Sequence, residues 1–518
     1  MALGFSPRGA SAPLCALPTA LEWNYQNRMR NYLRGAAILA LLPCLSSAAS
    51  DDGLESSIKS ITQAYAIVED NAAEPVSAEQ AFFQGAIPGM LRRLDPHSVF
   101  FDPGQFEQLR KLQTSTDKGF GSVVSVLPGR VIVLQALPGT PSAKSGIAPG
   151  DEILAVNGYQ LSRLDMDQLV SLLTQSRQQQ AQLVVRRPGN ARFLNFVLTP
   201  EEVQSPSVDR AFFLKPGIGY LRVSSFDEKT GRLIRDAIEK LGGRNLKGLV
   251  LDLRKNPGGL VTSALETAAL FLKPGSRIVT VRGRNVAEKS EDVPTGATPY
   301  EFPLAVLVND RTASASEIVA GALQDHDRAT IIGEASFGKG LVQSVYPLSE
   351  GTGLALTTAL YYTPSGRSIQ KPLDSAQFAL GPATAHPNGL SEFHTDAGRR
   401  VTGGGGIVPD YVVDQAPTTR LRAVLDGSGS FTTFATGYVA DHKITEDFEV
   451  TSGLLDDFQV FLAQRDIQPG VGEWSVEREF VANRLKTEIF NLTLGVEKGD
   501  EVEAQRDPQI VKAVDVLK

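Results

Sequence analysis

Three segments between residues 251 and 343 combine residue types that could do chemistry. In the first, Asn309 to Leu323, small hydroxyl residues follow an apolar run and open a helix. A serine there, such as Ser314, would lie where backbone N–H groups are unpaired and the helix dipole is positive. Both features favour a nucleophile and an oxyanion. Serine and threonine are equally ordinary helix caps, so this segment alone favours simple capping.

The second segment places Lys339 between Gly338 and Gly340. A lysine that acts as a general base must be neutral, so its pKa must fall from about 10.4 to about 7–8. Burial in a mostly apolar setting without a nearby carboxylate could supply that shift. Taken alone, a lysine flanked by glycines is more often a solvated loop residue.

The third segment, Leu253 to Val261, runs from a buried strand through the turn Asn256-Pro257-Gly258-Gly259 into a helix. Such a turn can direct backbone N–H groups at a developing oxyanion. The simpler interpretation is a tight connection that needs glycine for its geometry only.

Other chemistries find little support in the chain. The five histidines are scattered without paired ligand spacing, and the chain has no nucleotide-binding glycine loop. The sequence therefore predicts no cofactor and no metal. A net charge of −7, with no dominant basic stripe, argues against a nucleic-acid partner.

Residues 1–49 have the pattern of a cleavable secretory leader. Arg30 and Arg34 precede the apolar run 35–45, and small residues follow it. Met29 would give a leader of ordinary length, although a longer leader from Met1 stays open. Both cysteines, Cys15 and Cys44, lie here; Cys44 as a lipid-acylation site is a weaker alternative because Pro43 precedes it. The mature chain is thus expected to lack thiols and disulfides, and no later apolar run could span a bilayer.

The rest of the chain divides into four parts by its hydrophobic pattern. Residues 50–115 have helical periodicity, and residues 116–200 have short apolar runs separated by Gly/Pro turns with one helix near 166–175. Residues 201–415 alternate strands with helices and include a loop-like stretch, 374–410. Residues 416–518 are helical again. The pattern predicts a multidomain α/β protein with a small β-rich insert and helical N- and C-terminal regions.

Together the motifs resemble the C-terminal processing peptidases, or tail-specific proteases. The resemblance rests on TASASE, on SFGKG with Gln343 four residues after Lys339, on the 25-residue interval from Ser314 to Lys339, and on LDLRKNPGG. LDPHS (94–98), GDEILAVNG (150–158), YYTPSGRSIQ (361–370) and GGGGIVPD (403–410) follow the family order. The resemblance covers about residues 55–415 and implies a core of the ClpP/crotonase α/β type. Residues 374–402 look longer than the usual link, and the tail from about 417 is not part of the common core.

The resemblance implies a role for each matching residue. Ser314 would be the nucleophile, Lys339 the general base, and Gln343 the group that orients the lysine. The N–H groups of Ala315 and Gly259 would form the oxyanion hole, with Gly258 as the alternative donor. Ser316 is the rival nucleophile, and the interval to Lys339 favours Ser314.

The strand-rich segment resembles a bacterial PDZ domain. Its carboxylate-binding loop would include Lys118, Gly119, Phe120, Gly121 and Ser122, whose amides would hold the free C-terminus of a substrate. A PDZ fold that serves only as a spacer, or one that gates the enzyme, stays open.

The resulting expectation is a serine endopeptidase of the bacterial periplasm or cell envelope, acting on proteins with exposed C-termini. Two alternatives remain: a Ser–His–Asp hydrolase that uses Ser314 with a distant histidine such as His326, and a PDZ scaffold without catalysis. The helical tail could serve dimerisation, docking of a partner such as an adaptor, or covering of the site.

Overall fold

The computed structural model describes residues 51–114, 118–203, 206–371, 392–415 and 418–518. The expected leader, with Met29 and both cysteines, lies outside the described residues. So does most of the long link before the glycine run. None of the described helices combines the length and the apolar content that crossing a bilayer requires.

The N-terminal region is helical except for one short strand. Its elements are α2 (Asp51–Asn71), α3 (Ala78–Ala81), the π-helical turn η2 (Phe82–Ala86), α4 (Ile87–Leu91), β1 (Val99–Phe101) and α5 (Pro103–Thr114). The sequence pattern predicted a helical region here, and strand β1 was not foreseen. It forms because Val99 pairs with Ala355 of strand β18 in the α/β core, a partner that local periodicity does not reveal.

The strand-rich module follows, and its main sheet has the order β3-β4-β5-β7-β8, with β6 added to β5. Its elements are β2 (Lys118–Gly119), β3 (Ser122–Leu127), β4 (Arg130–Ala136), α6 (Pro141–Lys144), β5 (Glu152–Val156), β6 (Tyr159–Gln160), α7 (Met166–Ser176), β7 (Ala181–Arg186), β8 (Leu194–Leu198) and β9 (Glu201–Glu202). Helix α7 coincides with the helix expected near 166–175. Asn157 and Gly158, both with positive φ, form the two-residue turn of the β5–β6 hairpin, as their sequence predicts.

The α/β core contains two sheets. The first has the order β10-β11-β12-β15-β16-β21; β10 and β11 are antiparallel, and the other neighbours are parallel. Its elements are β10 (Val208–Lys215), β11 (Ile218–Val223), α8 (Thr230–Lys240), β12 (Gly248–Asp252), α9 (Val261–Ala269), β15 (Leu304–Val308), α10 (Ala315–Asp325), β16 (Thr330–Gly333) and β21 (Tyr411–Val412). Strands β12 and β15 are buried along their whole length, which explains their continuous apolar sequences.

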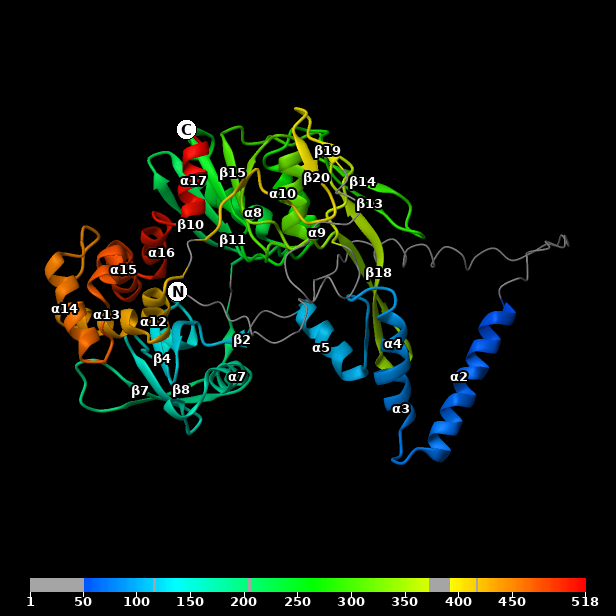
Figure 1. Cartoon of the computed structure of the whole chain (residues 1–518), viewed down its shortest axis with the longest axis horizontal. Helices are drawn as coiled ribbons and strands as arrows, with labels where there is room; N and C mark the ends of the chain where they lie inside the picture. Colours follow the sequence, from blue (N-terminus) through cyan, green and yellow to red (C-terminus); the bar gives the residue numbers. More distant parts are fainter. Residues whose placement is uncertain (1–50, 115–117, 204–205, 372–391, 416–417) are drawn as a thin grey trace.

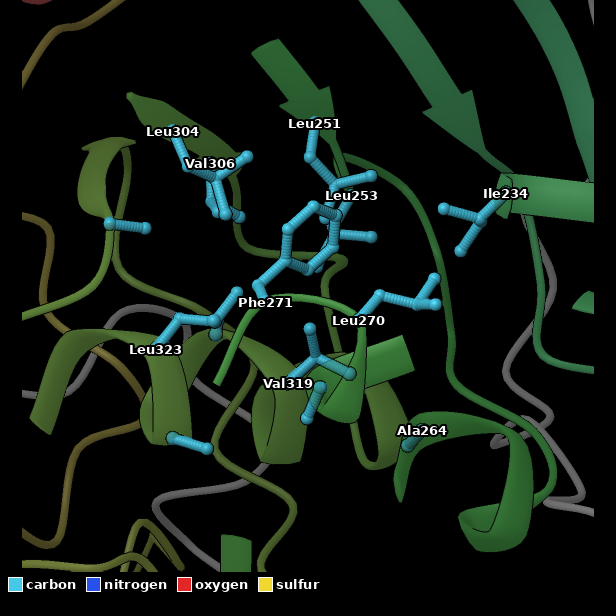
Figure 2. Packing of buried hydrophobic residues seen from close by; sticks show 14 of the residues in the cluster. Ile234, Leu251, Leu253, Ala264, Leu270, Phe271, Leu304, Val306, Val319 and Leu323 are labelled. Carbon is cyan, nitrogen blue, oxygen red and sulfur yellow. The ribbon is translucent and has the colours of Figure 1, made fainter. Parts of the chain in front are cut away.

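A hydrophobic core holds the helices against this sheet. Figure 2 shows Leu251 and Val306 of the sheet facing Val319 of α10, with Phe271 between them. These side chains are at most 1% exposed. The packing therefore fixes the start of α10 relative to the ends of β12 and β15.

The second sheet has the order β1-β18-β13-β14, with β17 paired to β18. Its core strands are β13 (Arg277–Arg282), β14 (Lys289–Asp292), β17 (Leu341–Pro347) and β18 (Gly353–Tyr362). Figure 1 shows β18 running from the core toward the N-terminal helices. The stretch 374–410, expected to be loop, contains a short hairpin of β19 (Glu392–His394) and β20 (Arg400–Thr402) in its described part.

The C-terminal extension contacts both the module and the core. Its helices are α12 (Arg420–Gly427), α13 (Ser430–Asp441), α14 (Ser452–Ala463), α15 (Val471–Thr493), α16 (Val496–Ala504) and α17 (Pro508–Val516). Leu134 of β4 packs with Ile489 of α15, and Ile510 of α17 packs on the sheet beside Leu307. Arg254 of the core donates to Asp507 at 2.6 Å. The extension thus ties the module to the core.

Candidate active site

Ser314 lies between the end of β15 and the start of α10, and only 6% of its surface is exposed. It takes the helix N-cap position, but its backbone has φ 56° and ψ −117°. Capping serines usually have extended backbone, and this conformation lies outside the regions that non-glycine residues favour. Ordinary capping therefore does not account for Ser314, and local strain of this kind is concentrated at functional sites.

Replacing Ser314 by glycine is expected to raise the free energy of unfolding by about 1 kcal/mol, because glycine adopts positive φ without strain. Ser314→Ala is the matched control: it also lacks the hydroxyl but keeps the strained backbone, so it should show no such gain. Urea unfolding of both variants and the parent chain measures the difference. If Ser314→Gly had no higher free energy of unfolding than Ser314→Ala, the interpretation that the Ser314 backbone is strained would be wrong.

Asn256 connects the glycine turn to the serine. Its side chain donates to the Val223 carbonyl at 2.8 Å, and its own carbonyl accepts from the Ala313 N–H at 3.0 Å. The Asn256 Oδ1 accepts from the Gly258 N–H at 2.9 Å. A β-carbon on Gly258 would lie 2.8 Å from that of Ser314. Only glycine fits there, so the turn packs directly against the serine.

Two backbone amides near Ser314 are unengaged. In the part of the chain that the structure describes, neither the Gly259 N–H nor the Ala315 N–H makes a backbone or side-chain hydrogen bond. A β-carbon on Gly258 would lie 2.9 Å from the Ala315 nitrogen, which places the turn beside the first amide of α10. Since the Gly258 N–H is already bound to Asn256, this geometry favours Gly259 over Gly258 as an oxyanion donor.

Lys339 precedes β17 and is 3% exposed, so it is not the solvated loop lysine of the simpler interpretation. Its Nζ donates to the Gln343 Oε1 at 3.3 Å, and the Gln343 Nε2 donates to the His97 carbonyl at 2.6 Å. Among the described residues, no hydrogen bond joins the Ser314 hydroxyl to the Lys339 amine.

A buried carboxylate, Glu317, brings the serine and lysine loops together. Its Oε2 accepts from the backbone N–H groups of Ser314 at 2.8 Å and Lys339 at 2.9 Å. Its Oε1 accepts from the Gly338 N–H at 2.7 Å and from the Ser336 hydroxyl. Because one oxygen holds both backbones, the two loops lie side by side.

Glu317 corrects the expectation of a site without a nearby carboxylate. Burial raises the pKa of Glu317, and its hydrogen bonds to Ser336, Lys339, Gly338 and Ser314 act in the opposite direction. The residue stands in the TASASE motif, but its role was not foreseen. A glutamate at the third position of a helix whose neighbours are all small or apolar was the available signal.

The remaining candidates are separated from the serine or engaged elsewhere. The Ser316 hydroxyl donates to the Asn256 carbonyl at 3.2 Å, and Ser316 is fully buried. His326 follows the last residue of the 11-residue helix α10 and lies 12 positions, or about 18 Å at 1.5 Å per residue, from Ser314. It pairs there with Asp396. No group of three or more His, Cys, Asp or Glu side chains in the described ranges could hold a metal.

The predicted carboxylate loop lies at the edge of the strand-rich module. Lys118 and Gly119 form strand β2, which pairs with β9, so this half of the loop is already strand. Phe120 and Gly121 form the loop proper, and Ser122 begins the edge strand β3. Gly121 has φ 74°, and a β-carbon there would lie 2.3 Å from that of Thr140.

Comparison with known proteins gives a family match for the α/β core and another for the strand-rich module. Residues 217–374 match Peptidase family S41, and residues 132–187 match the PDZ domain. A carboxy-terminal-processing protease of Bartonella bacilliformis is 40% identical over 297 residues, which are 56% of this chain and 68% of the relative. The chain belongs to peptidase family S41. It is a serine-type peptidase whose S41 fold carries a PDZ domain.

Further proteins similar to this chain are also named as processing proteases. A carboxyl-terminal-processing protease of Synechocystis is 35% identical over 55% of this chain and 68% of the relative. The carboxy-terminal processing protease CtpB of Bacillus subtilis is 30% identical over 63% of this chain and 68% of the relative. A solved photosystem II D1 C-terminal processing protease aligns with 68% of this S41 chain and 92% of its own, at 26% identity and a TM-score of 0.40.

Proposed function

We propose that this S41 peptidase cleaves proteins near their C-termini by forming an acyl-enzyme on Ser314, with Lys339 as the general base. The observation that carries the proposal is the shared carboxylate of Glu317, which holds the backbones of Ser314 and Lys339 together in a buried site. The relatives named above are C-terminal processing proteases, which supports the substrate class.

The proposed reaction has two stages. The Ser314 oxygen attacks the scissile carbonyl while Lys339 accepts its proton, and the same proton passes to the leaving amine. The N–H groups of Gly259 and Ala315 stabilise the oxyanion. In the second stage Lys339 takes a proton from water, which attacks the acyl carbon. Lys339 then returns this proton to the Ser314 oxygen as the ester bond breaks, which releases the new C-terminus and the free serine.

Cleavage of an unfolded protein with an apolar C-terminus tests this function. The chain lacking its leader should cleave it, Ser314→Ala should not, and His326→Ala should cleave at nearly the parent rate because His326 is at the far end of α10. Product masses and rates are read by mass spectrometry. Loss of cleavage in His326→Ala would favour the Ser–His–Asp alternative, and binding without cleavage by the parent chain would favour the scaffold.

We propose further that the PDZ domain holds the substrate tail. Strand β3 stands at the edge of its sheet, so a peptide can add to it as a further strand. Phe120 and Val124 of this edge, with Leu172 of α7, are partly buried apolar side chains that pack on the domain core. They suit an apolar terminal residue, and the Phe120–Gly121 loop suits its carboxylate.

Amidation of the substrate's C-terminus is therefore expected to raise KM about tenfold, equivalent to about 1.4 kcal/mol of binding, and to change kcat little. Gly121→Ala should raise KM similarly for the free-acid substrate and leave the amidated one unaffected. Gly158→Ala is the matched control, since Gly158 also has a positive φ but an added β-carbon there would meet nothing within 4 Å. Equal KM values for free-acid and amidated substrates would contradict tail binding.

Export to the periplasm or cell envelope is the last part of the proposal. Its support is the sequence pattern of residues 1–49. Substrates would then be envelope proteins with unstructured C-terminal tails.

A further inference from the structure

A short buried turn precedes β1 and is organised by one carboxylate. The Asp95 Oδ1 accepts from the N–H groups of His97 at 2.7 Å and Ser98 at 2.8 Å. Its Oδ2 accepts from the Ser98 hydroxyl at 2.6 Å. Asp95 and Ser98 are 4% and 6% exposed. We call residues 95–98 the Asp95 turn.

The Asp95 turn is fixed to the strand pair that carries the lysine. The Ser98 hydroxyl oxygen accepts from the Thr357 N–H of β18 at 3.2 Å. The next residue, Val99, begins the pairing of β1 with β18. Strand β18 in turn pairs with β17, which contains Gln343. The turn is thus held in a defined position relative to Gln343.

The His97 carbonyl of this turn determines which way the Gln343 side-chain amide points. A carbonyl can only accept a hydrogen bond, so at 2.6 Å it must face the Nε2 group. The Oε1 is then left for the Lys339 amine, 3.3 Å away. If the Gln343 amide were reversed, its NH2 group would face the Lys339 amine, and hydrogen-bond donors of the two side chains would point at each other. The His97 carbonyl can orient the Gln343 amide in this way only if the turn that carries the carbonyl is rigid.

We propose that Asp95 is a positioning residue for catalysis: it fixes the His97 carbonyl, which orients Gln343 and through it Lys339. This inference rests on the proposed role of Lys339 as the general base. It assigns a task to the LDPHS motif, which lies 217 positions before Ser314 when counted from His97. Asp95 does not touch the substrate.

Steady-state kinetics on the full chain test the proposal with five variants: Asp95→Ala, Asp95→Asn, Gln343→Ala, the Asp95→Ala/Gln343→Ala double variant, and Lys339→Ala. Asp102→Ala is the matched control. The Asp102 carboxylate also accepts a backbone N–H, that of Gln105 at 2.8 Å, but it caps α5 and does not face Gln343. Thermal melting of each variant measures stability separately.

Asp95→Ala is expected to lower kcat about tenfold or more, with KM changed less than about twofold. Asp95→Asn should recover to within about threefold of the parent, because its Oδ1 still accepts both amides. In the Gln343→Ala background, Asp95→Ala should cause no further loss of kcat, since the two residues act through one interaction.

Three results would overturn the positioning role. They are a double variant whose loss is the product of the two single losses, an equal loss of kcat in Asp102→Ala, and an Asp95→Ala effect confined to KM or to melting temperature. The Lys339→Ala variant separates the two proposals. Parent-like cleavage by it would refute the dyad and the positioning role together. If Lys339→Ala is inactive but the effects of Asp95→Ala and Gln343→Ala on kcat are independent of each other, only the positioning role would be refuted.

Discussion

Lys339→Ala is expected to lower kcat at least about a thousandfold, because in the proposed mechanism the serine hydroxyl loses the group that accepts its proton. Lys339→Arg should be equally inactive, since a guanidinium stays protonated and cannot act as a base. The measurement is kcat on an unfolded protein substrate with an apolar C-terminus.

Lys371→Ala is the matched lysine control. Lys371 lies beside the same loop, where its backbone N–H donates to the Gly338 carbonyl at 3.0 Å and its amine lies over the Phe337 ring. This variant should keep nearly the parent kcat. A Lys339→Arg enzyme that retains a tenth or more of parent activity would exclude the lysine as the base.

Glu317→Gln is expected to have the second large effect, a loss of kcat of about a hundredfold or more together with about 2 kcal/mol of stability. Both oxygens of the carboxylate accept hydrogen bonds, and all four donors point at them. Glutamine offers one oxygen, so its NH2 group would face two donors. The Ser314 and Lys339 loops would then separate. Kinetics and urea unfolding measure the two losses.

Glu334→Gln provides the control for Glu317→Gln. Glu334 lies in the same connection from β16 to the lysine, but it is half-buried rather than fully buried. The substitution should leave kcat and stability nearly unchanged. A Glu317→Gln enzyme as active and as stable as Glu334→Gln would show that the shared carboxylate does not hold the site together.

The raised pKa of Glu317 gives the direction of its pH effect. Because burial raises the pKa above its usual value of 4.5, the carboxyl takes up a proton at a higher pH than an exposed glutamate does. Its protonated oxygen can no longer accept from two donors, so the site should lose its geometry. This proton binds more tightly to the folded than to the unfolded chain, so uptake as the pH falls favours the fold. Protonation of Glu317 by itself should therefore lower activity without unfolding the chain.

The sequence alone predicted most elements of the α/β core, because the patterns that indicate these strands and helices are local. Strands β12 and β15 are continuous apolar runs, and α10 follows small hydroxyl residues, so their order and type follow from periodicity. The TASASE, SFGKG and NPGG motifs, with Gln343 and the 25-residue interval between Ser314 and Lys339, together selected the family that the comparisons then showed.

The missed features all depend on contacts between distant parts of the chain. Strand β1 exists only because β18, more than 250 positions later, offers an edge to Val99. The Glu317 carboxylate acquires three of its four donors from a loop about 20 positions further on. Gln343 meets the His97 carbonyl across 246 positions. Periodicity and motif spacing carry no information about which distant groups will be adjacent.

The choice between Gly258 and Gly259 is a local feature that the sequence also leaves open. Both glycines stand in one turn, and the sequence does not distinguish their amides. In the structure the Gly258 N–H is bound by the Asn256 side chain, and the Gly259 N–H has no such partner within the described residues. The distinction comes from a side chain two positions away that folds back on the turn.

Rapid acid quenching of the cleavage reaction, followed by mass spectrometry of the digested enzyme, tests the central claim most directly. The account predicts that an acyl fragment of the substrate accumulates on the peptide containing Ser314, with the fragmentation spectrum placing it on that serine. It predicts no such adduct in Lys339→Ala over the same interval. An adduct on Ser316 or another residue, or an adduct that forms on Ser314 equally fast without Lys339, would contradict the account.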